Sequence, residues 1–277
     1  MNIGKYAELY SEDLRLKNYA DTSIENYVSQ VKSFLNAFNL KASKPSEINE
    51  KQIKEWLLEA KTINSRKHRI SALKLFYKLT IKQPLKFKYI EYPKSDKKLP
   101  IVLSVQEIQR MFDVCDNKKH KVILALLYSC GLRVSELINL KWSHIDRSRM
   151  IINVIQAKGK KDRQVMLTPE LIPLLTEYYN EYKSKDYVLN GQIELQYSSR
   201  SVGEVIKKLA TKAGINKRVY THLMRHCSFT HLVEIGTDLN LIQRLAGHSN
   251  VRTTAIYTHI SHNLISKINS PLSSIRL

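Results

Sequence analysis

The sequence predicts a mainly α-helical protein of two domains whose β-structure is limited to a small hairpin. Apolar residues recur at helical spacing through residues 1–92. A polar, basic stretch flanked by prolines follows at 93–103 and has the composition of a linker. The remainder, 104–277, is helical in pattern except for one strand–turn–strand segment, and it ends in a tail at 264–277.

The first domain is predicted to contain four amphipathic helices. Thr22-Ser23-Ile24-Glu25 has the pattern of a capping box at a helix start. Asn49 is a candidate cap for the third helix, and the fourth is predicted from about Asn64 to Ile81. The apolar side chains expected to face the core are Ile24, Tyr27, Val28, Val31, Phe34, Leu35, Phe38, Ile53, Trp56, Leu57, Ile70, Leu73, Phe76 and Tyr77.

Basic residues gather on the fourth helix and beyond it. From Lys61 to Lys98 there are twelve Lys and Arg residues and only two acidic residues, Glu91 and Asp96. One interpretation is a surface that follows DNA phosphates, and the other is an ordinary solvated face. On the first interpretation the residues of this domain that contact DNA are Arg66, Lys67, Lys74, Lys78 and Lys82.

The charge balance favours a polyanionic partner. The chain has 45 Lys and Arg residues against 25 Asp and Glu, a formal net charge of +20. Nucleic acid is the usual partner of so basic a chain, although a lysine-rich composition alone would also produce the excess. Three scattered cysteines, no signal-like N-terminus and no apolar run approaching ~18 residues predict a cytoplasmic protein without a membrane span.

The second domain opens with a capping box at Ser104-Val105-Gln106-Glu107. An apolar helix over residues 122–128 stops before Gly131. The predicted hairpin pairs residues 150–155 with 163–167 across the basic turn Lys158-Gly159-Lys160-Lys161. Further helices are predicted from there to the end of the chain.

Two local clusters in the first half of this domain contain residues that could take part in a reaction. Arg133 follows a glycine-terminated helix, with Glu136 three residues on; alone, the pair would fit an ordinary surface arginine beside a helix cap. The hairpin turn could direct Lys158, Lys160, Lys161 and Arg163 towards DNA or a reaction centre, or could simply be solvated.

Two more clusters follow near the end of the chain. His222 and Arg225 are three residues apart, so they share one helical face, where an imidazole beside a guanidinium suits phosphate binding; a buried structural histidine is the alternative. Gly247-His248 has the pattern of a helix end, and Tyr257 lies nine residues beyond His248. A lone tyrosine says little, because the chain has 15.

Together, in this order and spacing, the four clusters resemble the tyrosine recombinase family, which includes phage integrases and Xer-like proteins. The family's catalytic set is an Arg, a Lys in a hairpin turn, a His-x-x-Arg, a Gly-His and a Tyr nine residues later. The resemblance spans Ser104 to about Ser261 by motif, and residues 1–92 as a helical core-binding domain. It implies the catalytic residues Arg133, Lys158, His222, Arg225, His248 and Tyr257, with Glu136 orienting a cationic neighbour.

The resemblance implies a site-specific recombinase that cuts and rejoins DNA through a 3′-phosphotyrosine bond and a Holliday junction. In that chemistry the arginines and His248 bind the phosphate, His222 assists the tyrosine and Lys158 protonates the leaving 5′ oxygen. Neither ATP, Mg²⁺ nor another cofactor is expected. Zinc binding by Cys227, His222, His226 and His231 is the alternative, although they lack paired metal-ligand spacing.

The resemblance also implies how the protein assembles. The two domains would form a C-shaped clamp round double-stranded DNA, and four protomers would join on two recombination sites through the tail, with accessory proteins. Integration, excision, inversion or dimer resolution, as for a mobile element, are the expected outcomes. The alternatives are a type IB topoisomerase, which uses the same chemistry, and a non-catalytic DNA-binding protein on the same scaffold.

Overall fold

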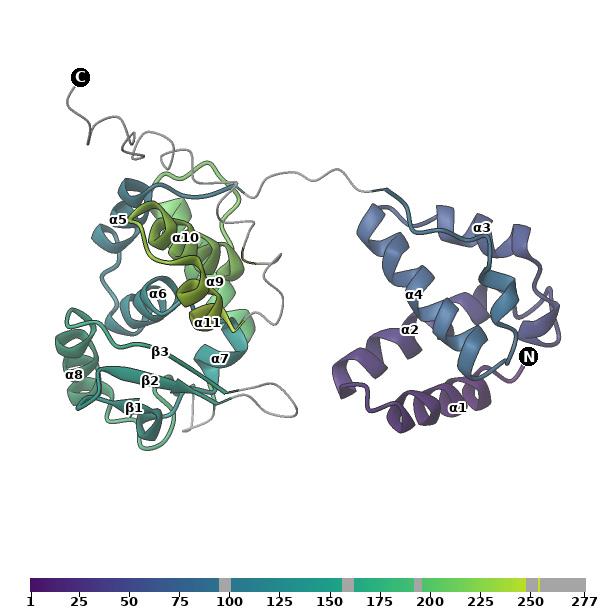
Figure 1. The fold of residues 1–277 in the computed structure, drawn as a ribbon, viewed down its shortest axis with the longest axis horizontal. Helices are drawn as coiled ribbons and strands as arrows, with labels where there is room; N and C mark the ends of the chain where they lie inside the picture. The colour runs from purple at the N-terminus through teal and green to yellow at the C-terminus, as the bar shows by residue number, and fades with distance from the viewer. Residues whose placement is uncertain (95–100, 156–161, 192–195, 248–253, 255–277) are drawn as a thin grey trace, which may run out of the picture. The chain divides into compact units, whose positions relative to one another are not determined.

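The chain divides into two compact units, Met1–Lys97 and Lys98–Leu277 (Figure 1). The computed structural model describes residues 1–94, 101–155, 162–191, 196–247 and 254. The division between the units falls inside the stretch at 93–103 that has the composition of a linker. Each unit has its own apolar core, so each is described by itself.

The first unit is an all-helical bundle. Its core is built from the predicted apolar stripes, together with Tyr10 and Leu14 of the first helix. Two buried phenols anchor the packing, because Tyr10 donates to the carbonyl of Ala72 and Tyr77 donates to that of Pro45. The helices are α1 (Ile3–Leu16), α2 (Asp21–Phe38), α3 (Glu50–Leu58) and α4 (Ile63–Leu79), with 3₁₀ turns at Pro45–Glu47 and Pro84–Phe87.

The helix caps of this unit agree with the sequence in one case and differ in another. Asn49 forms a capping box with Gln52 at the start of α3, as predicted. The capping box predicted at Thr22 is wrong, because α2 begins at Asp21, two residues earlier than that box requires, and Ala20 occupies the cap position without a side-chain bond. Asp21 lies in the first turn instead, where its negative charge is favourable to the helix dipole.

The second unit is mainly helical and carries a small antiparallel sheet, with the order β1-β2-β3, along one edge (Figure 1). The predicted hairpin is present, with Ile152 opposite Val165, and a short additional strand pairs with β2. The strands are β1 (Ile145–Asp146), β2 (Ile151–Val154) and β3 (Arg163–Met166). The helices are α5 (Val105–Asp113), α6 (Lys118–Ser129), α7 (Val134–Ile138), α8 (Leu171–Tyr182), α9 (Ser199–Lys212), α10 (Thr221–Glu234) and α11 (Leu239–Ala246).

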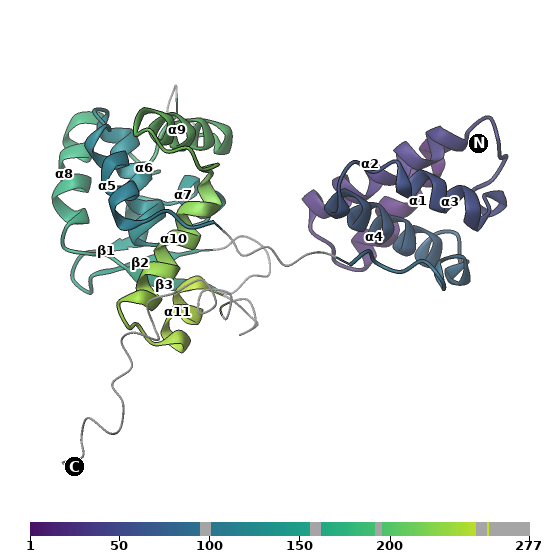
Figure 2. The same cartoon turned by 90° about the horizontal axis from the view of Figure 1, so that it is seen from above.

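Two buried helices hold this unit together. All residues of α6 from Val122 to Leu127 are buried, which explains the unbroken apolar run in the sequence. Helix α10 packs against α6 and also contacts α9 and α11, and α11 lies beside β3 (Figure 2). The Ser104–Glu107 capping box starts α5 as predicted. Among the helices that the structure describes, none is long and apolar enough to cross a membrane.

Candidate active site

A sharp turn after α6 delivers Arg133 to the start of α7. Gly131 has a φ of +56°, and a Cβ built on it would lie 2.6 Å from the ring of Phe229, so only glycine fits this position. Arg133 is the N-cap residue of α7, and its backbone N–H donates to Glu136 Oε2 at 2.7 Å. The capping interaction considered for Glu136 is therefore present, but the same carboxylate has further partners.

The Glu136 carboxylate lies among three arginines. Its Oε1 accepts from Arg133 Nη1 at 2.7 Å, and its Oε2 accepts from Arg163 Nη2 at 2.9 Å. Arg225 Nη1 lies 3.9 Å from the same Oε2. The Glu136 side chain is only 4% exposed, so these contacts are screened little by water. One carboxylate facing three guanidinium groups leaves an excess of positive charge at this point of the fold.

Arg225 links this cluster to the C-terminal end of α11. Its side chain is fully buried, lies over the ring of Phe229, and donates to the carbonyls of Gly131 and Ala246. Arg133 Nη2 also donates to Ala246, at 3.4 Å. Ala246 is the last residue of α11, where unpaired carbonyls carry partial negative charge that a cation stabilises. Of the two arginines predicted to be catalytic, Arg133 is the one that faces solvent, with 30% of its side chain exposed.

Two histidines lie on α10 beside the buried Arg225. The rings of His222 and His226 are 4.5 Å apart and nearly perpendicular. Partial burial, followed by the positive charges of Arg225 and Arg133, lowers the pKa of His222 below its usual value, although the residue remains exposed. Burial, followed by the charges of His222 and Arg225, lowers the pKa of His226 to about 4. Both rings are therefore neutral at pH 7, and a neutral imidazole is able to accept a proton.

The last described turn of α11 ends in a left-handed residue. Gly247 has a φ of +60° and caps the helix, which confirms the helix end predicted from Gly247-His248. Thr254, further along the chain, is fully buried. His248 and Tyr257 lie outside the described residues, as do Lys158, Lys160 and Lys161 of the hairpin turn.

Both units match known protein families. Residues 102–263 match the phage integrase family, and residues 7–87 match the phage integrase N-terminal SAM-like domain. The chain belongs to the phage integrase family. Tyrosine recombinase XerC of Bacillus pumilus is 31% identical over 96% of this chain and 95% of its own length.

Solved structures of recombinases share the fold. The crystal structure of XerA recombinase covers 96% of this chain and 97% of its own, with 30% identity and a TM-score of 0.57. A lambda integrase tetramer bound to a Holliday junction covers 92% of this chain and 76% of its own, with 18% identity and a TM-score of 0.76. This member of the phage integrase family is a tyrosine site-specific recombinase, which cleaves and rejoins DNA, and the relatives favour that function over the alternatives.

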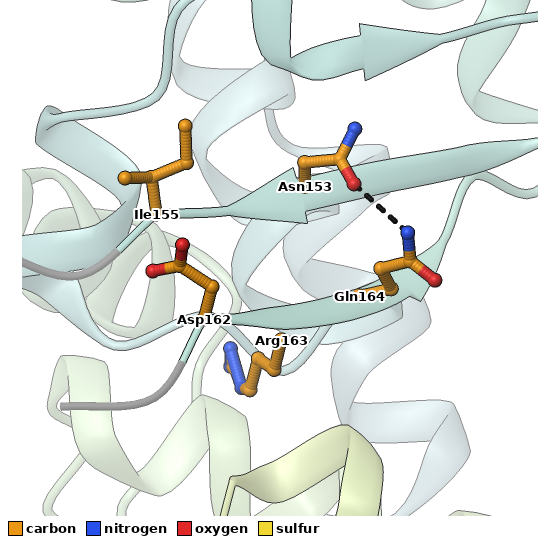
Figure 3. Close-up of a pocket in the computed structure, with 5 residues that line it drawn as sticks. All are labelled: Asn153, Ile155, Asp162, Arg163 and Gln164. Atoms are coloured by element: carbon orange, nitrogen blue, oxygen red, sulfur yellow. Dashed lines mark hydrogen bonds between the residues drawn. The ribbon is translucent and has the colours of Figure 1, made fainter.

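Arg163 of this recombinase does not lie where a DNA-contacting residue was expected. Its side chain is only 4% exposed and is paired with Glu136, so the prediction of a surface contact is corrected. Figure 3 shows the reason, since Arg163 points to the face of β3 opposite to Asn153 and Gln164, which are hydrogen bonded at 3.1 Å. An open pocket around these residues reaches Ile155 and Asp162, the last described residues on either side of the turn.

The arginine was missed because its neighbours in sequence are basic turn residues. The signal was the alternation of β3, in which Arg163 shares the buried side of the strand with Val165, while Gln164 is exposed. An arginine in register with core residues needs a buried partner, and Glu136 supplies it. The carbonyl of Ala246, which accepts hydrogen bonds from Arg133 and Arg225, had no sequence signal.

The basic residues of the first unit are only partly free to bind phosphate. Lys78 is exposed on α4, whereas the Lys74 ammonium lies 4.9 Å above the ring of Tyr92. Lys82 does not continue the helical face of Lys74 and Lys78, because α4 ends at Leu79 and Lys82 has a left-handed φ of +61°. Arg66 and Lys67 are partly buried near the start of the same helix.

Two of the four residues considered for zinc, Cys227 and His231, have other partners. His231 bonds to the Tyr128 hydroxyl at 2.8 Å and to the Leu103 carbonyl at 3.0 Å, and Cys227 Sγ accepts from the Leu103 N–H. Within the ranges that the structure describes, no three His, Cys, Asp or Glu side chains are grouped to hold a metal ion. The two contacts with Leu103 fasten the start of the second unit to α10, and the contact with Tyr128 joins α10 to α6.

Proposed function

We propose that this recombinase cuts DNA by joining a strand end to Tyr257 through a 3′-phosphotyrosine bond. The observation that supports the proposal is the buried cluster of Glu136 with Arg133, Arg163 and Arg225 at the end of α11. An excess of preorganised positive charge is what a phosphoryl transfer needs, because its transition state gains negative charge on the phosphate oxygens. His248 follows Gly247 directly, and Tyr257 lies nine residues further on.

In the proposed reaction the Tyr257 oxygen bonds to phosphorus as the bond to the 5′ oxygen breaks. The phenol proton passes to His222, which is neutral at pH 7 because its pKa is lowered. The leaving 5′ oxygen takes a proton from Lys158. Strand joining reverses these transfers with the 5′ hydroxyl of another strand, so the phosphotyrosine bond keeps the energy and no nucleotide cofactor is consumed.

The two arginines proposed to be catalytic differ in exposure, and we propose that they act in different ways. Arg133 would bind a non-bridging phosphate oxygen, and the partial exposure of its side chain supports this role. Arg225 is buried and its terminal nitrogens donate to two carbonyls, so in this conformation it acts through its charge and by holding the end of α11. A buried charge acts strongly at short range because little water screens it. His248 is proposed as the second donor to the phosphate.

The direct test is trapping of the wild-type protein on a nicked suicide substrate in excess EDTA. Loss of the short fragment beyond the nick leaves the enzyme covalently attached to DNA, which a denaturing gel resolves. We expect the adduct to form at an unchanged rate with EDTA, because guanidinium groups supply the positive charge that a metal would otherwise provide. An adduct that disappears in EDTA and returns with Mg²⁺ would contradict the proposal.

Lys158 is proposed as the acid that protonates the leaving group, because its position in the sequence falls between the paired strands β2 and β3. Lys158→Ala should cut ordinary DNA about 10²–10⁴ times more slowly, the usual contribution of a general acid. On DNA with sulfur in place of the bridging 5′ oxygen, the variant should recover, because a thiolate leaves without a proton. Lys160→Ala and Lys161→Ala are matched controls, which should cut ordinary DNA normally. If one of them instead cut slowly and recovered on the sulfur substrate, the role of general acid would pass to that lysine.

We further propose that four protomers assemble on two double-stranded recombination sites through the tail 264–277, with accessory proteins. The solved tetramer of lambda integrase on a Holliday junction supports this assembly. The match to the phage integrase family supports sites that belong to a mobile element. The tail's large apolar side chains would each contribute roughly 1.5–3 kcal/mol if buried on a neighbour, before ordering costs; they are Leu264, Ile265, Ile268, Leu272, Ile275 and Leu277.

Truncation after Asn263 separates this proposal from a tail that folds back on its own unit. The shortened protein should bind single sites normally but fail to form two-site complexes, as measured by native gel or light scattering. Normal two-site complexes would contradict docking on a neighbour. A collapsed melting temperature would instead show that the tail belongs to the core of its own protomer.

A further inference from the structure

Arg163 connects three parts of the site that are far apart in the sequence. It is the first residue of β3, directly after the hairpin turn, and its Nη2 is 2.9 Å from Glu136 Oε2 on α7. Its stem also lies against Gly247, because a Cβ built on that glycine would be 2.7 Å from Arg163 Cδ. The strand, the carboxylate and the end of α11 therefore meet at one side chain.

The Arg163 stem occupies the space that a Cβ at residue 247 would need. A Cβ within 3.0 Å of another heavy atom forces something to move, so the bare glycine backbone lets the arginine stem lie flat on the end of α11. Gly214 provides a comparison, because it also has a left-handed φ, +65°, but a Cβ there would meet nothing within 4 Å. At residue 247 the arginine stem is therefore a second reason for glycine, in addition to the left-handed backbone that both positions share.

The guanidinium of Arg163 is buried and paired with Glu136. Within the described part of the chain, its Nε and Nη1 are buried and have no hydrogen-bond acceptor. A buried cation with one ion pair costs stability relative to an apolar side chain of similar size, so its presence indicates a role other than stability.

We infer that Arg163 is a positioning residue, which fixes the end of α11, the helix that directly precedes His248 in the sequence, against the Glu136 carboxylate beside Arg133. The inference rests on the proposed function. The ion pair sets where the arginine head lies, and the stem then sets where Gly247 lies. Since Glu136 also holds Arg133, Arg163 keeps the phosphate-binding arginine and the chain segment that leads to His248 in fixed relation. Groups around a reacting phosphate need such support, because a shift of about 1 Å can cost roughly 100-fold in rate.

The first test compares Arg163→Met and Arg163→Lys with Gln164→Met, the next residue on the exposed face of the same strand. Arg163→Met should form the covalent adduct about 100-fold more slowly while binding DNA as wild type does. Arg163→Lys, which keeps both the stem and the charge, should recover part of the rate, and Gln164→Met should react normally. A direct DNA contact predicts something else, namely weaker binding and a salt dependence reduced by about one ion.

The sulfur-containing substrate identifies the step that is lost. Adduct formation by Arg163→Met should stay slow on DNA with a 5′-bridging sulfur, because protonation of the leaving group is not what the residue supports. Full recovery on this substrate would overturn the inference, since Arg163 would then act through Lys158 and the hairpin turn.

A double-mutant cycle tests the contact itself. Gly247→Ala and Arg163→Ala should each slow adduct formation, and the pair together should be little slower than Arg163→Ala alone, because the short side chain removes the clash. Gly214→Ala is the control for left-handed strain without a clash. Additive losses would overturn the inference. The same double-mutant cycle can be measured by melting temperature, which tests the contact between Arg163 and Gly247 without any activity. A wild-type protein that formed no adduct would therefore refute the proposed function but would leave this test of the contact intact.

Discussion

Tyr257→Phe is expected to abolish covalent attachment to DNA while leaving DNA binding unchanged. The substitution removes only the hydroxyl oxygen, which is the atom proposed to bond to phosphorus. Binding depends instead on Lys and Arg contacts with many phosphates, which this change leaves intact. Adduct formation on the suicide substrate should fall below detection, while band shifts on a single site should show the same affinity.

Tyr220→Phe is the matched control for this prediction. Tyr220 is exposed and lies two residues before His222, so it is the described tyrosine nearest to the site in sequence. It should form the adduct at the wild-type rate. If Tyr257→Phe retained adduct formation and Tyr220→Phe lost it, the nucleophile would have to be reassigned.

Glu136→Gln is expected to have the largest effect on stability. Glutamine has nearly the same shape but no charge, so the three guanidinium groups would lose the buried carboxylate that lies among them. Breaking a buried ion pair by removing one partner costs about 3–5 kcal/mol. For a unit of this size that corresponds to a melting temperature lower by roughly 6–20 °C. Adduct formation should fall as well, because Arg133 loses the bond that orients it.

Glu204→Gln separates this effect from a general loss of negative charge. Glu204 is exposed on α9, so its replacement should change the melting temperature little. Thermal unfolding of both variants, followed by circular dichroism, gives the comparison. Equal stability of the Glu136 and Glu204 variants would contradict the view that one carboxylate holds the arginine cluster together.

Much of the fold was predictable because it depends on local pattern. The stripe along α2 and the unbroken apolar run of α6 each follow from the burial of one element. The hairpin was visible from its two strand-like runs, whereas β1 is only two residues long and left no periodic signal. The Thr22 box failed because a capping pattern fixes a helix start only to within a residue or two.

The site was predictable where its residues share a motif, and not where long-range contacts assemble it. His222 and Arg225 lie on one helix as their spacing required. The burial of Arg163 depends on Glu136, 27 residues earlier, and on Gly247 at the end of another helix, and neither contact can be inferred from the basic turn that precedes it. The hydrogen bonds that Arg133 and Arg225 donate to the Ala246 carbonyl likewise arise from long-range packing.

The central claim is that DNA becomes attached to Tyr257, and mass spectrometry of the trapped adduct tests it most directly. Wild-type protein joined to a suicide substrate would be digested with nuclease and protease, and the nucleotide-bearing peptide sequenced by fragmentation. The account predicts a single modified peptide that contains Tyr257, with the nucleotide linked through its 3′ phosphate to the phenol oxygen. Attachment at any other residue, or through a 5′ phosphate, would contradict it.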